Sequence, residues 1–560
     1  MRGAVCSTGP LRVRWLGRVP YREALAVQQA LFEHGREQHL LLLEHDHVFT
    51  YGQHADLARN LRCDPGAVGA DFVAVNRGGD ITYHGPGQLV GYPILSIPNA
   101  KGSLRHVLSV EALLIDALSE LGLPGAARLR GYPGVWVDAA GDNPRKIAAI
   151  GVRLARGRTM HGFALNVDTD MAFMREHIVA CGIDDRPVTS LAEEGIDVSM
   201  SRVVDVVSAL AAARWGGGHA ERQDVAWYHR PDDLVPFSRG AGPGETVTYR
   251  PRSHARLEQA GVSDGLSIET RKPDWLRPKV RLGAEVMELK RTVRELGLVT
   301  VCEDAGCPNL SECWSDGTAT LMVLGDRCTR ACGFCLVDTR KPSAPADDEP
   351  MRVAAAVRRM GLDHAVLTMV ARDDLPDGGI AHVARCVEAV RAACPQAAIE
   401  TLISDAKGSP ESLRPLFDVR PDVLNHNLET VARLQRAVRP SAGYARSLAV
   451  LAHAKEAGLV TKSGIMVGLG ETDDEIVGAL ADLAGIGCDI VTIGQYLRPT
   501  THHLPVARWV DPSEFVRWKQ LGEHLGIGHV EASPLTRSSY HAKDAASGAV
   551  RSVEVALSAH

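Results

Sequence analysis

Six of the twelve cysteines in this chain lie within residues 302–335, and they form two triplets. Cys302, Cys307 and Cys313 have the spacing C-x4-C-x5-C, and the second triplet has the spacing C-x3-C-x2-C, with members Cys328, Cys332 and Cys335. Structural zinc usually has four closed ligands from two pairs of residues, whereas three thiolates leave one iron of a four-iron cluster without a cysteine ligand. The stretch therefore favours two [4Fe-4S] clusters over zinc or disulfides.

The second triplet, with Phe334 just before its last cysteine, resembles the signature of radical S-adenosylmethionine enzymes. That resemblance implies that the open iron chelates the amino and carboxylate groups of S-adenosylmethionine and passes one electron to break its C–S bond. A motif remains a hypothesis until its structural context is known, so zinc and disulfides stay as alternatives.

Length and composition predict a soluble protein with two large domains. At 560 residues the chain exceeds the limit of about 250–300 residues at which a single core stops growing. A net charge of −6 gives no basic excess that would indicate nucleic acid or an anionic membrane as a partner. No segment approaches the roughly 18 consecutive apolar residues of a membrane span, and the first residues lack an apolar signal core. We expect a cytoplasmic protein.

The domain boundary is expected where the composition changes. Between about Gly216 and Pro278 the chain mixes glycine, proline and charged residues with little periodicity, as domain edges and linkers do. Helical patterning resumes at 285–296. We therefore expect a domain over residues 1–240, a linker over 241–274 and a second domain over 275–560.

The first half has a mixed α and β pattern that leads into a glycine-rich segment. Residues 21–35 predict an amphipathic helix, and 39–44 and 71–77 predict strands. The last of these strands continues into RGGDITYHGPGQLVGYPIL, where glycines permit close backbone approach between polar side chains. Alone, this segment is more typical of a tight turn between strands than of a functional site.

Lys146 and Cys181 are candidates for chemistry in the same half. Lys146 begins the predicted strand 147–154, which is expected to pair with 160–167 through the turn ARGR, and Cys181 precedes a glycine in a turn. An ammonium group near a thiol lowers the thiol pKa and so favours the nucleophilic thiolate. A single cysteine is nevertheless more often an inert core thiol.

Four motifs together change this interpretation: RGGDITYHGPGQ, RKIAAIG, HGFALN and ACGI-x6-SL, in that order. Over roughly residues 20–210 they resemble lipoate-protein octanoyltransferases. The resemblance implies the α+β fold of biotin and lipoate protein ligases, an acyl thioester on Cys181, and Lys146 as its general acid/base. His47 stands where that family usually has a proline. The resemblance also implies an acyl pocket lined by Arg77, Gly78, Gly79, Asp80, Ile81, Thr82, Tyr83, His84, Ala149, Ile150, Gly151, Gly162, Phe163 and Ala164.

The second half predicts a parallel, partly open (β/α)6 barrel. Strand candidates at 319–325, 365–370, 398–404, 423–429, 462–468 and 490–497 alternate with helical stretches such as 380–393 and 473–484. Sites on such barrels lie at the carboxyl ends of the strands. The motifs RDDLPDGG, NHNLET, KSGIMVGLGET and GQYLRPT all fall there. Each alone could be a strand–helix cap or a set of hydrogen-bonded core residues.

Together with both cysteine triplets and the terminal RSSYHA at 537–542, these motifs resemble lipoyl synthases over about residues 275–550. The resemblance implies that Cys302, Cys307 and Cys313 hold an auxiliary cluster whose fourth ligand is a serine of RSSY, and that this cluster supplies sulfur to C6 and C8 of an octanoyl chain. We assign Ser539 rather than Ser538, without physical grounds in the sequence for separating them. Ala371 stands where this family usually has an acidic residue.

The sequence thus predicts a bifunctional enzyme of lipoate synthesis. Its expected cofactors are two [4Fe-4S] clusters and S-adenosylmethionine. Its expected partners are octanoyl-acyl carrier protein, lipoyl carrier domains of 2-oxoacid dehydrogenase complexes or the glycine cleavage H protein, and an electron donor such as ferredoxin or flavodoxin. Two alternatives remain: a first half that only docks carrier proteins beside an active second half, and a non-catalytic iron–sulfur or zinc protein.

Overall fold

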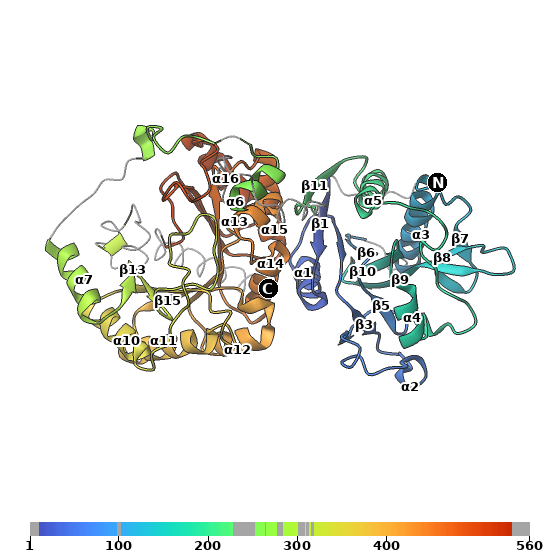
Figure 1. Ribbon diagram of the computed structural model, residues 1–560, viewed down its shortest axis with the longest axis horizontal. Helices are drawn as coiled ribbons and strands as arrows, with labels where there is room; N and C mark the ends of the chain where they lie inside the picture. Colours follow the sequence, from blue (N-terminus) through green and yellow to red (C-terminus); the bar gives the residue numbers. More distant parts are fainter. Residues whose placement is uncertain are drawn as a thin grey trace, which may run out of the picture. The chain divides into compact units, whose positions relative to one another are not determined.

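The chain forms two compact units, residues 1–227 and 228–560, in a computed structural model (Figure 1). The structure describes residues 10–97, 102–227, 252–263, 265–276, 284–300, 309, 313–314 and 318–539. Each unit has its own sheets and hydrophobic core.

The first unit contains an eight-stranded mixed sheet in the order β11-β1-β2-β6-β10-β9-β8-β7 and a three-stranded sheet in the order β4-β3-β5. The strands are β1 (Leu11–Arg18), β2 (His39–Glu44), β3 (Val48–Tyr51), β4 (Asp71–Ala74), β5 (Thr82–His84), β6 (Gln88–Ile94), β7 (Ala127–Leu129), β8 (Tyr132–Val137), β9 (Arg145–Ala155), β10 (Arg158–Asn166) and β11 (Ala220–Asp224). The helices are α1 (Tyr21–Glu33), α2 (Leu57–Asn60), α3 (Gly102–Glu120), α4 (Met171–His177), the 3-10 turn η1 (Ala180–Gly182) and α5 (Met200–Trp215).

The large sheet is held between helices because its strands carry apolar residues on both faces. Helices α3 and α5 share one core with the sheet, in which Leu113, Val207 and Ile147 are fully buried. Helix α1 contacts β6 and β10. The predicted hairpin of β9 and β10 is confirmed, with Arg158 opposite Ala155 in an antiparallel register.

The second unit contains a sheet whose spatial order follows the sequence from β12 to β19. Strand β12 is antiparallel to β13, and all later neighbours are parallel. The strands are β12 (Val299–Thr300), β13 (Thr318–Val323), β14 (His364–Met369), β15 (Ala398–Leu402), β16 (Val423–Asn425), β17 (Thr461–Val467), β18 (Ile490–Gln495) and β19 (His529–Ala532).

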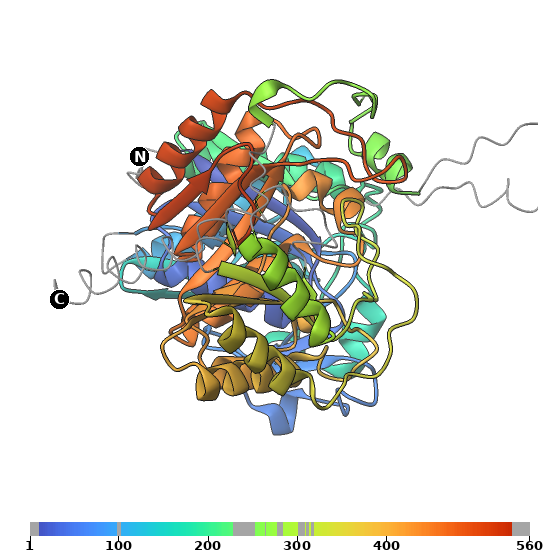
Figure 2. The same ribbon diagram turned by 90° about the vertical axis from the view of Figure 1, so that its left-hand side faces the viewer.

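Helices lie along the outside of this curved sheet, where Figures 1 and 2 show α10, α11 and α12 in succession. They are α6 (Arg252–Gln259), η3 (Asp274–Leu276), α7 (Ala284–Glu295), α10 (Glu349–Met360), α11 (Ile380–Ala393), η4 (Ala406–Gly408), α12 (Pro410–Asp418), η5 (Ala432–Leu434), α13 (Gln435–Val438), α14 (Tyr444–Glu456), α15 (Asp473–Gly485) and α16 (Pro512–Leu525). The edge strands β12 and β19 are not paired with each other, so the barrel is open.

All six predicted barrel strands are present, and the predicted fold class is confirmed. Strand β16 is shorter than the pattern predicts because the chain leaves the sheet after Asn425, and Glu429 has a left-handed backbone (φ 67°). Strand β19, which the sequence analysis does not predict, extends the parallel series by one.

Part of the segment expected as a linker packs on the second unit. Helix α6 contacts α13, and Leu257 at its C-terminal end is only 2% exposed. The guanidinium of Arg433 donates to the carbonyl of Ala260, and the amide of Leu266 donates to the carbonyl of Val506 at 2.7 Å. Residues from 252 onward therefore belong structurally to the barrel unit.

None of the helices within the described residues is long and apolar enough to cross a membrane.

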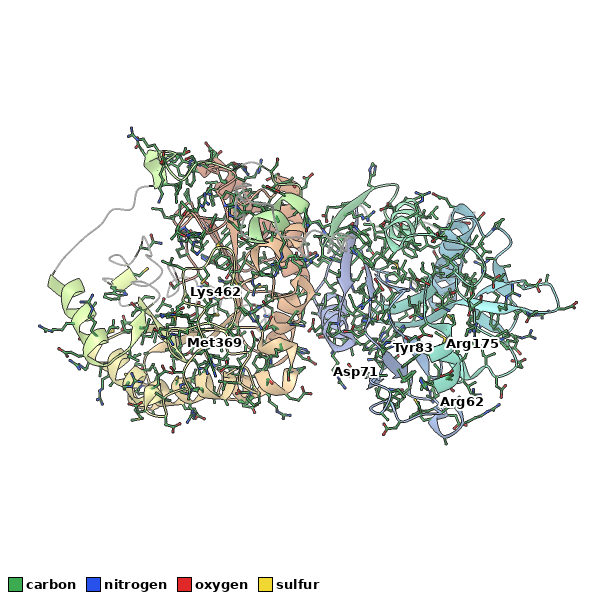
Figure 3. All side chains as sticks on the ribbon, viewed as in Figure 1. Arg62, Asp71, Tyr83, Arg175, Met369 and Lys462 are labelled. Atoms are coloured by element: carbon green, nitrogen blue, oxygen red, sulfur yellow. The ribbon has the colours of Figure 1, made fainter. Side chains whose placement is uncertain are left out.

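A buried ion pair lies inside the barrel. The Nζ atom of Lys462 on β17 donates to Oε2 of Glu400 on β15 at 2.9 Å, and both side chains are at most 1% exposed (Figure 3 labels Lys462). Burial raises the pKa of Glu400, but the ammonium of Lys462 and the bonds from His364 and Asn425 outweigh it, and the pKa falls to about 2. The carboxylate is therefore charged and matched by a cation inside the core.

Replacing Lys462 with methionine is expected to destabilise the second unit by about 3–5 kcal/mol at neutral pH, because Glu400 is left as a buried charge without its cation. The folded-state pKa of Glu400 lies below its unfolded value of about 4.3, so the stabilisation is present above that pH and is lost as the pH falls toward 2. Calorimetry of the full chain between pH 3 and 8 measures both effects. Lys455→Met, which removes a partly exposed pair with Asp489, is the matched control, with a loss of less than about 1 kcal/mol.

Candidate functional sites

A cavity of about 140 Å³ in the first unit collects the residues that the sequence analysis assigns to an acyl site. Cys181 and Lys146 both line it, together with every predicted pocket residue except Ile81 and Tyr83. Those two pack in a hydrophobic cluster with Phe49 instead. The reason is the alternation of strand β5, which directs Thr82 and His84 to the cavity and Tyr83 to the opposite face.

Several cavity residues were not predicted: Tyr21, Val90, Tyr92, Pro133, His161 and Ile183. Of these, His161 lies directly before the motif residue Gly162 and has a left-handed backbone (φ 60°), which no sequence pattern reveals. Tyr21 comes from α1, far away in sequence, and only the fold brings it to this wall.

Cys181 has a left-handed backbone, with φ 58° and ψ 20°. For a residue other than glycine this conformation costs of order 1–3 kcal/mol and persists only where the surroundings hold it. Two hydrogen bonds do so: the amide of Cys181 donates to the carbonyl of Ile81, and the amide of Val179 donates to the carbonyl of Asn60, both at 2.8 Å. The turn fixes the thiol at the rim of the cavity, half-buried.

Asn60, at the end of α2, joins this turn to the glycine-rich segment. Its Nδ2 donates to Oδ2 of Asp80 at 2.9 Å, and Oδ1 of Asp80 accepts the amide of Ile81 at 2.6 Å. Ile81 in turn accepts the amide of Cys181, so one buried asparagine contacts both loops that line the cavity. Loop geometry around the thiol therefore depends on Asn60.

Lys146 is 5% exposed, and its ammonium lies 4.9 Å from the ring centroid of Trp136. Strand β9 positions it, because its amide is bonded to the carbonyl of Pro187 at 2.9 Å and its carbonyl accepts the amide of Thr189. Among the described residues no carboxylate bonds to its side chain. The ammonium is thus held by an aromatic face rather than by an anion, which leaves its protons available to a substrate.

Arg77 adds a second cation to the cavity wall. Its guanidinium donates to the carbonyl of Thr50 at 2.7 Å and to the carbonyl of Asp80 at 2.9 Å. Burial lowers the pKa of Arg77, while the charge of the nearby Cys181 sulfur acts in the opposite direction.

Histidines in the cavity wall are uncharged. Burial is the largest cause that lowers the pKa of His84 and of His161 to about 3, and Arg77 contributes to both. His84 stacks on Tyr21 with ring centroids 5.9 Å apart. Neutral rings of this kind give the inner end of the cavity an apolar surface, as an acyl chain needs.

His47, at the family's usual proline position, bonds instead to the hydroxyl of Tyr83 at 2.8 Å.

Replacing Asn60 with leucine is expected to loosen the Cys181 turn, because Asp80 loses the Nδ2 donor of Asn60 and lies directly before Ile81, which holds the amide of Cys181; the backbone bond from Val179 to the carbonyl of residue 60 remains. The buried bond is worth about 1–3 kcal/mol when one partner is removed. We expect a changed rate of alkylation of Cys181 by iodoacetamide, followed by mass spectrometry of its peptide, and a lower melting temperature of the first unit. Arg62→Ala, an exposed change two residues away, serves as the control; equal alkylation rates in all three proteins would contradict the assignment.

A larger cavity of about 430 Å³ lies inside the barrel of the second unit. Its lining includes Cys328, Cys332 and Cys335, residues of strands β13, β14, β17 and β18, and the serines Ser538 and Ser539. The cavity thus collects residues that the sequence analysis assigns to each of the two clusters.

The loop of the second triplet is fixed by charged side chains. Arg330, between two of the cysteines, donates to Oδ1 of Asp373 at 2.7 Å and to Oδ1 of Asp405 at 2.6 Å, and Asp405 is fully buried. Thr329 donates to the carbonyl of Ala371 at 2.9 Å. Ala371 lines the cavity where the family usually has an acidic residue, so the wall is uncharged at this position. The backbone carbonyl of Ala371 still holds the loop through Thr329.

The thiols fit a metal cluster better than free cysteines. Burial raises the pKa of Cys332 to about 12 and also raises the pKa of Cys335. Buried neutral thiols such as those of Cys332 and Cys335 gain nothing from proximity, whereas a bound metal deprotonates its thiol ligands and satisfies them together. The donor set therefore suits an iron–sulfur cluster with one open iron.

Of the first triplet, Cys302 and Cys307 lie outside the described residues, and Cys313 is buried beside Trp314. The structure nevertheless bonds one described residue of this stretch, Asn309, to the segment that precedes the serines of RSSY. Nδ2 of Asn309, between Cys307 and Cys313, donates to the carbonyl of Leu535 at 2.7 Å, and Asn309 is 4% exposed. The sequence analysis did not single out Asn309.

The two serines of RSSY differ in their surroundings. Oγ of Ser538 accepts from Nδ2 of Asn425 at 2.8 Å and donates to Oδ1 of Asn427 at 3.2 Å. Within the described part of the chain, no hydrogen bond involves the hydroxyl of Ser539, which lines the cavity. This difference was not visible in the sequence.

Among the described residues, Glu349, His382 and Cys386 also have spacing suitable for a metal ion. Two of these side chains already bond within the protein. Oε2 of Glu349 accepts from Nε2 of His382 at 2.6 Å and from the amide of Leu324 at 2.8 Å. Burial raises the pKa of the Cys386 thiol to about 12. The group supports the start of the loop that carries the second triplet, because Leu324 directly follows β13.

Comparison with known proteins shows which families the two halves of this chain are similar to. Lipoyl synthase from Mycobacterium avium is 52% identical over 297 residues, which are 53% of this chain and 96% of that protein. Lipoyl synthase from Rubrobacter xylanophilus is 54% identical over 275 residues, 49% of this chain and 86% of its own. The chain belongs to the lipoyl synthase family.

The family models divide the chain as the structure does. The N-terminal domain of lipoyl synthase matches residues 252–307, beginning where α6 begins, and the radical SAM superfamily matches 322–483. Residues 20–211 match the lipoyl protein ligase A/B catalytic domain. The lipoyl synthase in this chain is therefore fused to a second lipoate-related catalytic domain, and both units are enzymes of lipoate synthesis.

Two solved structures are similar at low scores. The match to a bi-partite lipoate protein ligase from Thermoplasma acidophilum covers 37% of this chain and 84% of the ligase chain, with 19% identity and a TM-score of 0.32. The match to methylornithine synthase covers 49% of this chain and 85% of the synthase chain, with 15% identity and a TM-score of 0.29. Scores of this size do not bear on activity.

Proposed function

We propose that this chain makes protein-bound lipoate in two successive reactions. The first unit transfers an octanoyl group from acyl carrier protein to a lysine of a lipoyl carrier domain, and the second inserts sulfur at C6 and C8 of that chain. The proposal is carried by the residues that line the two cavities: a thiol and an ammonium in the first, and three cysteines together with the serines of RSSY in the second.

In the first reaction, the sulfur of Cys181 attacks the thioester carbonyl of the donor, and the donor thiol leaves with a proton. The ε-amine of the carrier lysine then attacks the acyl-Cys181 carbonyl, and Cys181 leaves as the thiolate. Lys146 supplies and removes the protons, since it is buried at the cavity wall without an anionic partner among the described residues. The amide of Cys181 is already bonded to Ile81, so the oxyanion donors must come from other groups, such as the glycine-rich turn.

In the second reaction, Cys328, Cys332 and Cys335 would hold one [4Fe-4S] cluster, and Cys302, Cys307, Cys313 and Ser539 a second. When bound, these clusters with S-adenosylmethionine supply the radical and the sulfur. The chain's own contribution is to hold the cysteine loop through Arg330 and to enclose the octanoyl chain in a cavity that excludes water.

The hydrogen bonds support Ser539 over Ser538 as the iron ligand. A ligating serine offers its oxygen to iron with the proton displaced, but Ser538 uses its proton to reach Asn427 and its lone pair to accept from Asn425. Removing that proton would place an anion against the carbonyl oxygen of Asn427. Ser539 carries no such conflict within the described residues.

The expected partners are octanoyl-acyl carrier protein, lipoyl carrier domains of 2-oxoacid dehydrogenase complexes or the glycine cleavage H protein, and a reductant such as ferredoxin or flavodoxin. An N-terminal unit that only docks carrier proteins would need neither Cys181 nor Lys146 in its cavity. Their presence together in a ligase-type domain favours transfer.

Replacing Cys181 with alanine is expected to abolish the octanoyl adduct on the chain and the transfer of octanoyl to a lipoyl domain. Lys146→Met should keep its shape but slow transfer by about 10²–10⁴-fold, as loss of a general acid/base does. Intact-protein mass spectrometry detects the adduct. Cys63→Ala removes a free thiol of the same unit that does not line the cavity, and should leave both steps unchanged. Full transfer by the Cys181 variant would refute the thioester.

Replacing Cys328, Cys332 and Cys335 with alanine is expected to lower the iron content after anaerobic reconstitution from about eight to about four per chain. Cleavage of S-adenosylmethionine should stop, while octanoyl transfer by the first unit continues at the wild-type rate. Iron analysis and product chromatography measure the two. One zinc per triplet and no visible-light absorption would contradict the proposal.

A further inference from the structure

We propose that Ser538 is a positioning residue: its hydroxyl, held by Asn425 and Asn427, sets the C-terminal segment so that Ser539 reaches the auxiliary cluster. This inference rests on the proposed function, in which Ser539 supplies the fourth ligand. It assigns a separate task to each serine of RSSY and extends the assignment to residues of the barrel wall.

The segment 533–539 is anchored before it reaches the serines. Nδ2 of Asn309 donates to the carbonyl of Leu535 at 2.7 Å, which ties the segment to a residue that lies between Cys307 and Cys313 in the sequence. The hydroxyls of Ser533 and Thr536 are bonded to each other at 2.8 Å, and the carbonyl of Pro534 accepts the amide of Gln495 on β18. These contacts fix residues 533–536 but leave the two serines to be oriented separately.

Ser538 provides that orientation through two amides of the barrel. Nδ2 of Asn425 donates to Oγ of Ser538 at 2.8 Å, and Oγ donates to Oδ1 of Asn427 at 3.2 Å. A hydroxyl that both accepts and donates to fixed partners has one preferred direction. The backbone on either side of Ser538 is then held, and Ser539 follows directly.

The direction of the Asn425 amide is itself set by the buried ion pair. Its Nδ2 also donates to Oε1 of Glu400 at 2.8 Å, while Oε2 of Glu400 accepts from Lys462. The carboxylate accepts only, so it requires the amide nitrogen of Asn425 on its side. The same nitrogen is therefore presented to Ser538, and Lys462 acts on Ser538 through Glu400 and Asn425.

The effect of this arrangement is to keep the two roles apart. A serine is a hard oxygen ligand among soft thiolates and is therefore suited to release iron when the cluster gives up sulfur. Such a ligand must be able to dissociate from iron while its residue stays in position. Ser538 would keep the segment in position whether or not Ser539 is bound to iron.

The test isolates the auxiliary cluster in the full-length chain. With Cys328, Cys332 and Cys335 all changed to alanine, anaerobic reconstitution should leave about four irons per chain. Ferricyanide removes an iron that lacks a protein ligand and leaves a three-iron cluster, which electron paramagnetic resonance detects. Iron content and this signal both report ligation without depending on activity.

We expect Ser538→Ala and Asn425→Leu to fall to about three irons after ferricyanide, as Ser539→Ala does, with the three-iron signal in each. Ser538→Thr, which keeps the hydroxyl, should retain the full cluster. Ser343→Ala changes an exposed serine that makes no hydrogen bond among the described residues; it is the matched control and should behave as the parent protein. Circular dichroism verifies that each variant is folded.

Cysteine variants separate positioning from direct ligation. Ser539→Cys should keep about four irons through ferricyanide because a thiolate now completes the set, whereas Ser538→Cys should not. If Ser538→Cys retains the cluster and Ser539→Cys does not, Ser538 is the ligand and the inference is overturned. Retention by Ser538→Ala and Asn425→Leu with loss in Ser539→Ala overturns the positioning role but leaves the proposed ligand standing. Retention in all the alanine variants refutes serine ligation itself.

Discussion

Parallel pairing from β13 to β19 is the constraint on which the second unit depends. Because every one of these strands runs in the same direction, their carboxyl ends meet at one edge of the barrel. The loop with the second triplet follows β13, and the residues that hold it follow β14 and β15. Side chains separated by more than seventy residues thereby form one support for three thiols.

Charge inside the barrel has a structural explanation. Isolated buried charges are strongly unfavourable, so each is matched: Arg330 by two aspartates, and Lys462 by Glu400. Apolar residues of similar volume could fill the same space and would serve stability as well. Polar groups are therefore explained better by the specific directions they give to neighbouring side chains than by a contribution to stability.

The sequence predicted elements and motifs well where periodicity is strong. The barrel strands, helix α11 at 380–393 and the β9–β10 hairpin followed directly from apolar spacing, and most residues that line the cavity of the first unit followed from motif resemblance. Prediction was poorer where one face of a short strand had to be chosen, as with Tyr83 on β5. It failed for Asn60 and Asn309, because an amide that joins distant loops leaves no periodic pattern. Asn425 lies in the motif NHNLET, which the sequence analysis did single out, but its bonds to Glu400 and Ser538 were not predicted. Helix α6 was also missed, because its polar composition is typical of a linker, although Leu257 is buried.

The bond between Asn309 and Leu535 makes the number of residues between Leu535 and Ser538 structurally important. Only two residues separate Leu535, held near the first triplet, from Ser538, held at the barrel wall. One of the two, Thr536, is buried and its hydroxyl is bonded to that of Ser533, so the connection is short and held from within. A single insertion or deletion there would shift one contact relative to the other, so the segment sets a fixed spacing between Asn309 and the barrel wall.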